Sequence, residues 1–214
     1  MMKNILFCGP PHFATASLEA IYKYQKELNY KLSGVVTIQD KISGRGQKKQ
    51  ESDVKKLGKK LNVKIFTPTE LSDTIFIEKI TKLNLDLIIV VAFKKLPEIL
   101  FKIPKYGTIN LHASLLPKYR GAGPIQWALM NGDKKTGVTI FQLKKEIDTG
   151  DILMQKEIGI RKDDDMLSLG MRLCKLGAHM VIDTMNQISN GSISKRKQNS
   201  GLISHAPKIT KNMT

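Results

Sequence analysis

An amide and an imidazole stand two positions apart at the end of a short apolar stretch, as Asn110 and His112 of GTINLH. In a β-strand, residues two apart point to the same face, so both side chains can reach one ligand. Imidazole titrates near neutral pH, and a neutral amide can donate a hydrogen bond to a developing oxyanion. This placement at a strand end suits catalysis.

Asp148, within EIDTGD, offers a carboxylate partner for this pair in an expected loop between two strands. Carboxylate, imidazole and amide together fit the transfer of an acyl-type group to an amine. Taken alone, Asp148 is equally compatible with an Asx-turn. An aspartic protease would need a second Asp-Thr-Gly motif, and the sequence has none.

The other histidines and both cysteines predict no metal site. His12 follows the first expected strand, where it could contact a substrate, whereas His179 falls in a helical pattern and His205 in a polar tail. Cys8 and Cys174 have no partner at ligand spacing, so we expect buried thiols that bind neither metal nor each other.

Nucleotide-binding motifs are also missing. No Gly-x-Gly-x-x-Gly follows the first strand, and no Gly-Lys-Ser/Thr loop occurs. The turn CGPPHF has few free N–H groups, because Pro10 and Pro11 have none. We therefore expect neither NAD binding nor ATP hydrolysis. The glycines of SGRGQKK (43–49) do not open onto a helix, so this stretch is interpreted as a flexible basic finger.

Strands that alternate with helices must position these residues. We expect strands at 3–9, 31–38, 63–68, 85–93 and 107–112, and helices at 53–62, 72–84 and near 96–101. Such alternation predicts a parallel sheet with right-handed crossovers, whose ligands gather at the carboxyl ends of the strands. Asn110, His112 and the loop 114–123 belong to such an end.

The pattern changes after residue 132. Strands at 135–143 and 151–160 have a short connection, which favours antiparallel pairing, and a long helix follows over 164–190. We predict an α/β fold: a Rossmann-like, mostly parallel sheet flanked by helices, with a late antiparallel strand pair and a long C-terminal helix. The segment 39–52 has no apolar period, so we expect an exposed loop there.

The net charge of +16 is unevenly distributed. The stretches 41–60 and 191–214 are its two strongly basic parts, which favours a nucleic-acid partner. The excess of Lys over Arg alone would also follow from compositional drift. No apolar stretch has the roughly 20 residues that span a bilayer, and the N-terminus lacks a signal-peptide pattern. We expect a cytoplasmic protein with no membrane partner.

The block INLHASLLPKYRGAGPIQWALMNGDKKTGVTIFQL, followed by EIDTGDIL, resembles the formyltransferases that use 10-formyltetrahydrofolate. The members that act on methionyl-tRNA are the most similar. ILFCGPPHFATASLEAI resembles the family's first strand, turn and helix, and SHAPKIT resembles the segment that leads out of its catalytic domain. The resemblance covers essentially the whole chain.

The resemblance implies transfer of a formyl group from 10-formyltetrahydrofolate to the amino group of methionine on initiator tRNA, for translation initiation. It implies no metal. Asn110, His112 and Asp148 match the catalytic trio. The residues that match the folate-holding loop are Ser114, Leu115, Leu116 and Pro117. The residues implied as contacts to the tRNA acceptor stem are Lys41, Arg45, Lys48 and Lys49, with Arg45 as the key contact.

The sequence departs from the family at its first turn, where Pro10 and His12 replace a Thr or Ser and an acidic residue. We expect a catalytic domain over 1–190 and a basic linker or tail over 191–214, without the family's C-terminal barrel-like domain. We further expect a monomer whose tRNA binding is weak and steeply salt-dependent.

Two alternatives stay open. The chain could formylate a small amine, either glycinamide ribonucleotide or an amino sugar nucleotide. The first enzyme usually has Pro where this chain has Ala113, and the second lacks the SGRGQKK loop. The chain could also be a non-catalytic tRNA-binding remnant, against which the intact trio argues.

Overall fold

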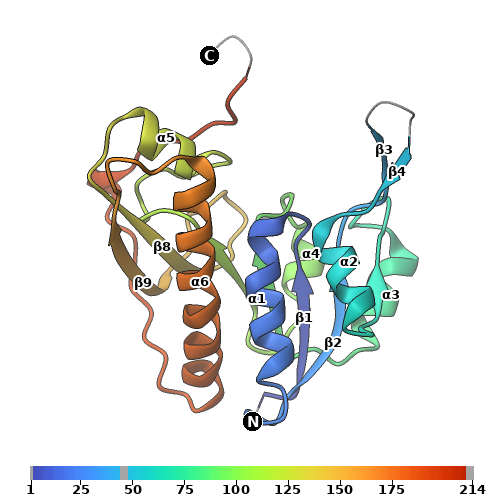
Figure 1. Ribbon diagram of the computed structural model, residues 1–214. Coiled ribbons are helices and arrows are strands. Elements are labelled where there is room, and N and C mark those ends of the chain that lie inside the picture. Colours follow the sequence, from blue (N-terminus) through green and yellow to red (C-terminus); the bar gives the residue numbers. More distant parts are fainter. Residues whose placement is uncertain (1, 44–47, 211–214) are drawn as a thin grey trace. The chain divides into compact units, whose positions relative to one another are not determined.

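The computed structural model in Figure 1 describes residues 2–43 and 48–210. The chain divides into two compact units, Met1–Ile109 (unit 1) and Asn110–Thr214 (unit 2). The boundary falls inside strand β7 (Thr108–His112), which starts in unit 1 and ends in unit 2. In the part of the chain that the structure describes, no helix has the length and apolar character needed to cross a membrane.

Unit 1 alternates strands and helices, as the sequence predicts. Its strands before β7 are β1 (Asn4–Cys8), β2 (Lys31–Val36), β3 (Lys41–Ser43), β4 (Lys48–Gln50), β5 (Ile65–Phe66) and β6 (Leu87–Val91). Its helices are α1 (His12–Lys23), α2 (Asp53–Lys60), α3 (Thr74–Thr81) and α4 (Glu98–Phe101). The main sheet has the order β5-β2-β1-β6 and then the start of β7.

The pairs of this sheet are parallel. β1 pairs with β2 and with β6, with Ile5 opposite Leu32 and Leu87, and β2 pairs with β5. All five residues of β6 are buried. A strand that is covered on both faces consists of consecutive apolar residues, and this pattern predicts β6 directly from the sequence.

β3 and β4 form a separate antiparallel ribbon that stands out from the rest of unit 1 (Figure 1). The prediction of an irregular loop over 39–52 is therefore wrong for the described part of this segment. The described side chains of this ribbon, Lys41, Lys49 and Gln50, are polar and exposed, so they leave no alternation of apolar and polar residues in the sequence. Helix α2 begins at Asp53, as predicted, and the Ser52 hydroxyl caps it by accepting from the N–H of Lys55.

Unit 2 holds the end of β7, helix α5 (Pro124–Met130), strands β8 (Lys135–Gln142) and β9 (Ile152–Gly159), and helix α6 (Met166–Ser189). β8 and β9 pair antiparallel, and α6 packs on both. Gly177 lets α6 approach β7, because a Cβ there would lie 2.7 Å from the Leu111 side chain. The predicted α/β fold, with its late antiparallel pair and long helix, is confirmed.

The chain after α6 returns along β9 toward α5 (Figure 1). Arg196 pairs with Ile152 through two backbone hydrogen bonds of 2.8 and 2.9 Å. A short 3₁₀ turn, Ser200–Leu202, precedes a bridge between Arg120 and His205. The Trp127 indole N–H donates to the carbonyl of Pro207 at 2.9 Å, which fixes this return on α5.

Candidate active site

Asn110 and His112 lie on the last three residues of β7, and alternation along the strand puts both side chains on one face. His112 is buried, with 6% of its surface exposed, whereas Asn110 is partly exposed. Within the described residues, the Asn110 amide makes no hydrogen bond to the protein. A partly exposed amide beside a buried imidazole leaves a neutral donor available for a ligand.

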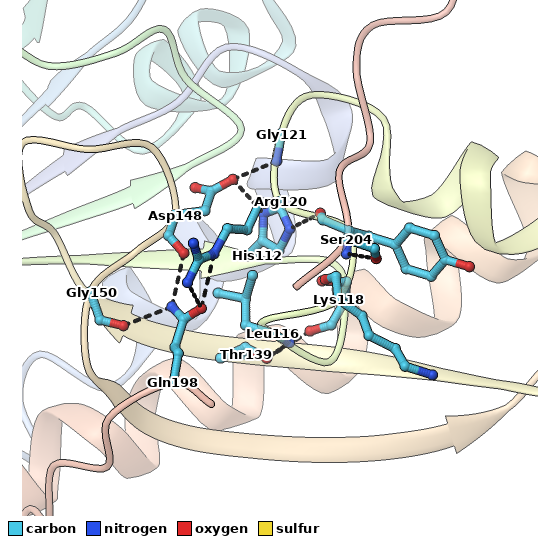
Figure 2. A network of polar contacts seen from close by, with 12 residues as sticks. His112, Leu116, Lys118, Arg120, Gly121, Thr139, Asp148, Gly150, Gln198 and Ser204 are labelled. Atoms are coloured by element: carbon cyan, nitrogen blue, oxygen red, sulfur yellow. Dashed lines mark hydrogen bonds and ion pairs between the residues drawn. The ribbon is translucent and has the colours of Figure 1, made fainter. Parts of the chain in front are cut away.

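Both nitrogens of His112 face defined partners. Nε2 lies 2.8 Å from the carbonyl oxygen of Tyr119, and Nδ1 lies 3.7 Å from Oδ2 of Asp148 (Figure 2). A carbonyl oxygen can only accept, so Nε2 carries a hydrogen whether the ring is neutral or charged. The ring therefore gains or loses its second proton at Nδ1, on the side of Asp148.

Tyr119 holds the carbonyl that orients His112. Its φ of 61° is left-handed, and its N–H donates to the hydroxyl of Ser204 at 2.9 Å. At the other end, the phenol donates to Asp133 at 2.8 Å and accepts from Asn131 at 2.9 Å. Burial raises the pKa of Tyr119, so the hydroxyl stays protonated and keeps donating to Asp133. The residue is fixed at both ends.

Asp148 approaches His112 from the loop between β8 and β9. Its φ is 54°, and its Oδ2 accepts from the N–H of Gly121 at 2.7 Å. The carboxylate is thus held by a residue 27 positions away in the sequence, in addition to facing His112 (Figure 2). The two ionisable side chains are 7% and 11% exposed, for His112 and Asp148 respectively. Charge interactions between largely buried side chains are screened less by salt than those at the surface.

Two glycines let these segments come together. At Gly150, a Cβ would overlap the carbonyl oxygen of Gln142, so the loop that carries Asp148 can cross the end of β8 only with glycine there. At Gly121, φ is +122°, and a Cβ would lie 2.6 Å from the carbonyl oxygen of Ala206. Both positions require close backbone approach, and Gly121 also needs a conformation that other residues rarely adopt.

The loop Ser114–Pro117 follows His112 and is tied to the hairpin of β8 and β9. The N–H of Leu116 donates to the Thr139 hydroxyl at 3.1 Å, which in turn donates to the Ser114 carbonyl at 2.6 Å. Gln155 donates to the Leu116 carbonyl at 2.9 Å. The Leu116 side chain is buried against Phe141 and Ile152, so this loop has one fixed path.

Several residues that build this site were not predicted from the sequence: Tyr119, Gly121, Thr139, Gln155 and Gln198. The first two lie in the glycine-rich bend after the strand, where the Gly signal was available but its partners were not. Gln198 donates to the carbonyls of Asp148 and Gly150, both at 2.8 Å, from a polar segment without periodicity. No local sequence pattern predicts hydrogen bonds between residues about 50 positions apart.

The proposed tRNA contacts lie in unit 1, on or between β3 and β4. Lys41 and Lys49 are exposed on the ribbon. Lys48 opens β4, although its side chain is not among those that the structure describes, and Arg45 lies outside the described residues. The structure thus places two of the four lysine and arginine side chains.

The surroundings of three other chemically capable residues, His12, Cys8 and Cys174, are also defined. His12 is the exposed first residue of α1, and both cysteines are buried, as expected. Burial raises the pKa of the Cys8 thiol, which keeps it protonated and unreactive. Across residues 2–43 and 48–210, no three His, Cys, Asp or Glu side chains gather as a metal ion would require.

Comparison with known proteins shows which family the chain is related to. Residues 2–185 match the family described as Formyl transferase. The methionyl-tRNA formyltransferase of Thermodesulfovibrio yellowstonii is 43% identical over 212 residues, which are 99% of this chain and 67% of that protein. The enzyme of the same name from a Sulfurihydrogenibium species is 44% identical over 97% of this chain and 66% of its own length. This chain spans about two thirds of these relatives.

A solved structure of glycinamide ribonucleotide transformylase 1 from Symbiobacterium toebii superposes with a TM-score of 0.76, over 92% of this chain and 95% of that one. Its identity is 16%, so this likeness supports the fold alone. The extent of the family match and the identity to the two curated relatives establish the kinship suggested by the block around Asn110. The chain is a formyltransferase and belongs to the formyl transferase family.

Proposed function

We propose that the chain transfers a formyl group from 10-formyltetrahydrofolate to the amino group of methionine on charged initiator tRNA, for translation initiation. The observation that carries this proposal is the 3.7 Å pairing of Asp148 with His112, a residue of β7, the strand that also carries Asn110, whose amide bonds to none of the described residues. The names of the curated relatives support the choice of acceptor.

In this reaction the amino nitrogen bonds to the formyl carbon, the bond from that carbon to N10 breaks, and one proton passes from the amine to N10. The folate supplies the formyl group. Asn110 donates from its amide to the formyl oxygen as negative charge develops there. His112, protonated at Nδ1, adds a second donor and a positive charge on the same face of β7.

Asp148 is the acceptor for the proton that the attacking amine releases. Its Oδ2 already accepts from Gly121, and it lies 3.7 Å from Nδ1, too far for a direct hydrogen bond in this arrangement. A small approach, or a water molecule, lets the carboxylate take the proton that the attacking amine releases. His112 gives its Nδ1 proton to N10 as the bond to the formyl carbon breaks, and then takes up the proton held by Asp148. The carboxylate also stabilises the charged imidazole while the oxyanion exists.

The folate site that we propose is the loop Ser114–Pro117. Two features of this loop suit a flat, partly apolar ligand. Its backbone follows one fixed path, and the Leu115 side chain, which packs over Gly137 of β8, is only partly buried. All four backbone carbonyls of the loop accept hydrogen bonds from residues of unit 2. The carbonyl of Ser114 accepts from Thr139, and that of Leu116 accepts from Gln155. The other two accept from backbone N–H groups. The loop would therefore present apolar side chains, rather than free carbonyls, to the cofactor.

The acceptor stem of the tRNA is assigned to the basic ribbon of β3 and β4. Lys41 and Lys49 are exposed there, and Arg45 stands between them in the sequence, outside the described residues. Lysine and arginine contacts to phosphates position a nucleic acid without reading its bases. This ribbon therefore supplies affinity and register for the tRNA, while the amino group of its methionine is the group that reacts at Asn110 and His112.

The experiment that tests the function supplies 10-formyltetrahydrofolate with three separate acceptors: methionine-charged initiator tRNA, glycinamide ribonucleotide and an amino sugar nucleotide. Formylated product is measured by mass spectrometry, and the Asn110→Ala variant controls for contaminating enzyme. We expect kcat/KM for the charged tRNA to exceed that for either small amine by about 100-fold or more, a difference of about 2.7 kcal/mol.

Each other outcome contradicts the proposal in a different way. Preference for a small amine would assign the chain to another branch of the family. Binding of tRNA without formylation of any acceptor would make it a non-catalytic tRNA-binding protein.

A further inference from the structure

The side-chain amide of Gln198 makes four hydrogen bonds among the residues that support the site. Nε2 donates to the backbone carbonyls of Asp148 and Gly150, both at 2.8 Å. Oε1 accepts from the Arg120 guanidinium, through Nε at 3.1 Å and Nη2 at 2.7 Å. Figure 2 shows the amide between the Asp148 loop and Arg120. The side chain uses both its donors and both its lone pairs.

The orientation of this amide is set by chemistry. The two backbone carbonyls on one side can only accept, and the guanidinium on the other can only donate. Rotating the amide by half a turn would place donors against donors and acceptors against acceptors. Gln198 is half-buried between exposed neighbours, Lys197 and Asn199, so its side chain alone in this stretch points inward.

These bonds hold Asp148 from two directions. On one side, the amide fixes the backbone of the Asp148–Gly150 loop, in which Asp148 has a φ of 54°. On the other side, it fixes Arg120, whose next neighbour Gly121 donates its N–H to the Asp148 carboxylate. The distance between Asp148 and His112 therefore depends on a residue 50 positions later in the chain.

Gln198 can act as an anchor because its own segment is fixed at both ends. Arg196 forms a two-bond bridge with Ile152 at the start of β9, and its guanidinium donates to Gln155 at 2.9 Å. Further on, Arg120 exchanges backbone hydrogen bonds of 2.9 and 2.7 Å with Ser204 and Ala206. The segment is thus built into unit 2 on either side of Gln198.

We propose that Gln198 is a positioning residue for the formyl transfer, acting through Asp148. This inference rests on the proposed function, since it concerns the geometry of the same reaction. Gln198 touches no reacting atom; it fixes the loop that carries the proton acceptor and the peptide N–H that orients the carboxylate. Small displacements of a catalytic group cost rate much more than they cost substrate binding.

The first test replaces Gln198 with Met, which has similar length and makes none of the four hydrogen bonds. We expect kcat for formyl transfer to fall about 10- to 100-fold, with KM for both substrates within about twofold. Gln25→Met is the matched control, because it also removes a glutamine side chain–backbone hydrogen bond, from Leu32 N–H at 2.7 Å, but in unit 1. That control should keep the wild-type kcat.

A second variant separates the two halves of the amide. Gln198→Glu keeps two oxygens for Arg120 but faces the carbonyls of Asp148 and Gly150 with an acceptor. If the donor half positions the loop, Gln198→Glu loses kcat as Gln198→Met does. Full activity of Gln198→Glu would show that the contact with the loop is irrelevant and would overturn the inference.

The decisive readout is a double-mutant cycle with Asp148→Asn. If Gln198 acts through Asp148, adding Gln198→Met to Asp148→Asn lowers kcat by less than about threefold, although Gln198→Met alone lowers it far more. Full additivity, or an unchanged kcat for Gln198→Met alone, would overturn the inference. A wild-type chain that formylates no acceptor would instead overturn the proposed function itself, so the two failures are distinguishable.

Discussion

Nδ1 of His112 lies 3.7 Å from Oδ2 of Asp148, while Nε2 of the same ring faces the carbonyl of Tyr119. The three residues come from the end of β7, the connection between β8 and β9, and the bend after β7. Because the carbonyl fixes one nitrogen as a permanent donor, the only site of proton exchange on the ring is the one beside the carboxylate.

This relationship predicts a large effect of removing the Asp148 charge. Asp148→Asn keeps an oxygen that can accept from Gly121, so the loop stays in place, but it cannot take a proton. We expect kcat/KM for formyl transfer to fall about 100- to 10,000-fold. Asp151→Asn, three residues on, removes a partly exposed ion pair with Lys144 and should stay within about twofold of wild type. Equal activity of the two variants in initial-rate assays would contradict the role of Asp148.

The crossing of the Asp148 loop over β8 predicts a steric cost at Gly150. Gly150→Ala would drive a Cβ into the carbonyl of Gln142, so we expect the free energy of unfolding to fall by about 3 kcal/mol. At Gly132 nothing lies within 4 Å, and only its φ of +65° opposes a side chain, so Gly132→Ala should cost about 1 kcal/mol. Urea unfolding midpoints compare the two, and a larger loss at Gly132 would contradict the packing described.

The start of α6 predicts a specific loss of stability in acid. The N–H of Ser168 donates to Asp165 and holds the pKa of this carboxyl below its usual value. The unfolded chain then binds more protons, so the stabilising contribution is complete above the ordinary carboxyl pKa of about 4. It is lost as pH falls below that value and through the lower pKa of the folded state.

Asp165→Asn isolates this effect, because asparagine also caps helices but does not titrate in this range. Its urea midpoint should fall less than that of wild type between pH 7 and pH 3. Asp163→Asn, at a nearby exposed aspartate, is the control, and its urea midpoint should fall with pH as that of wild type does. An identical fall for Asp165→Asn and wild type would contradict the assignment of the cap.

The basic ribbon predicts salt-dependent tRNA binding. The logarithm of the association constant should fall linearly with the logarithm of salt concentration, by about 0.7 to 0.9 for each phosphate contact. Lys41→Ala and Lys49→Ala should each reduce this slope by about 1, and Lys175→Ala on α6 should leave it unchanged. Filter-binding titrations at several salt concentrations measure the slopes. A dissociation constant that does not respond to salt would contradict the ribbon's role.

The sequence predicts the parts of this protein whose signals are local. The buried run of β6 and the alternation of strands and helices define the sheet, and a strand end defines the place of Asn110 and His112. The ribbon of β3 and β4 was missed because its described side chains are exposed and polar, and so give no apolar alternation. The division between residues 1–190 and 191–214 stays a prediction.

The support of the site could not be predicted, because its contacts join distant segments. Asp148 is an ordinary turn residue until Gly121 and His112 meet it, and nothing around Gln198 marks it among Lys, Asn and Ser. A polar side chain that serves backbone carbonyls has no periodicity and no motif.

The rate of a single turnover with Asn110→Ala tests the central claim most directly, since Asn110 makes no other described hydrogen bond whose loss could disturb the fold. Saturating amounts of the variant and of wild type are mixed with 10-formyltetrahydrofolate and methionine-charged initiator tRNA, and formylated product is followed in time. We predict that the rate falls about 100- to 1,000-fold, the cost of one oxyanion donor. A rate within about threefold of wild type would contradict formyl transfer at this site.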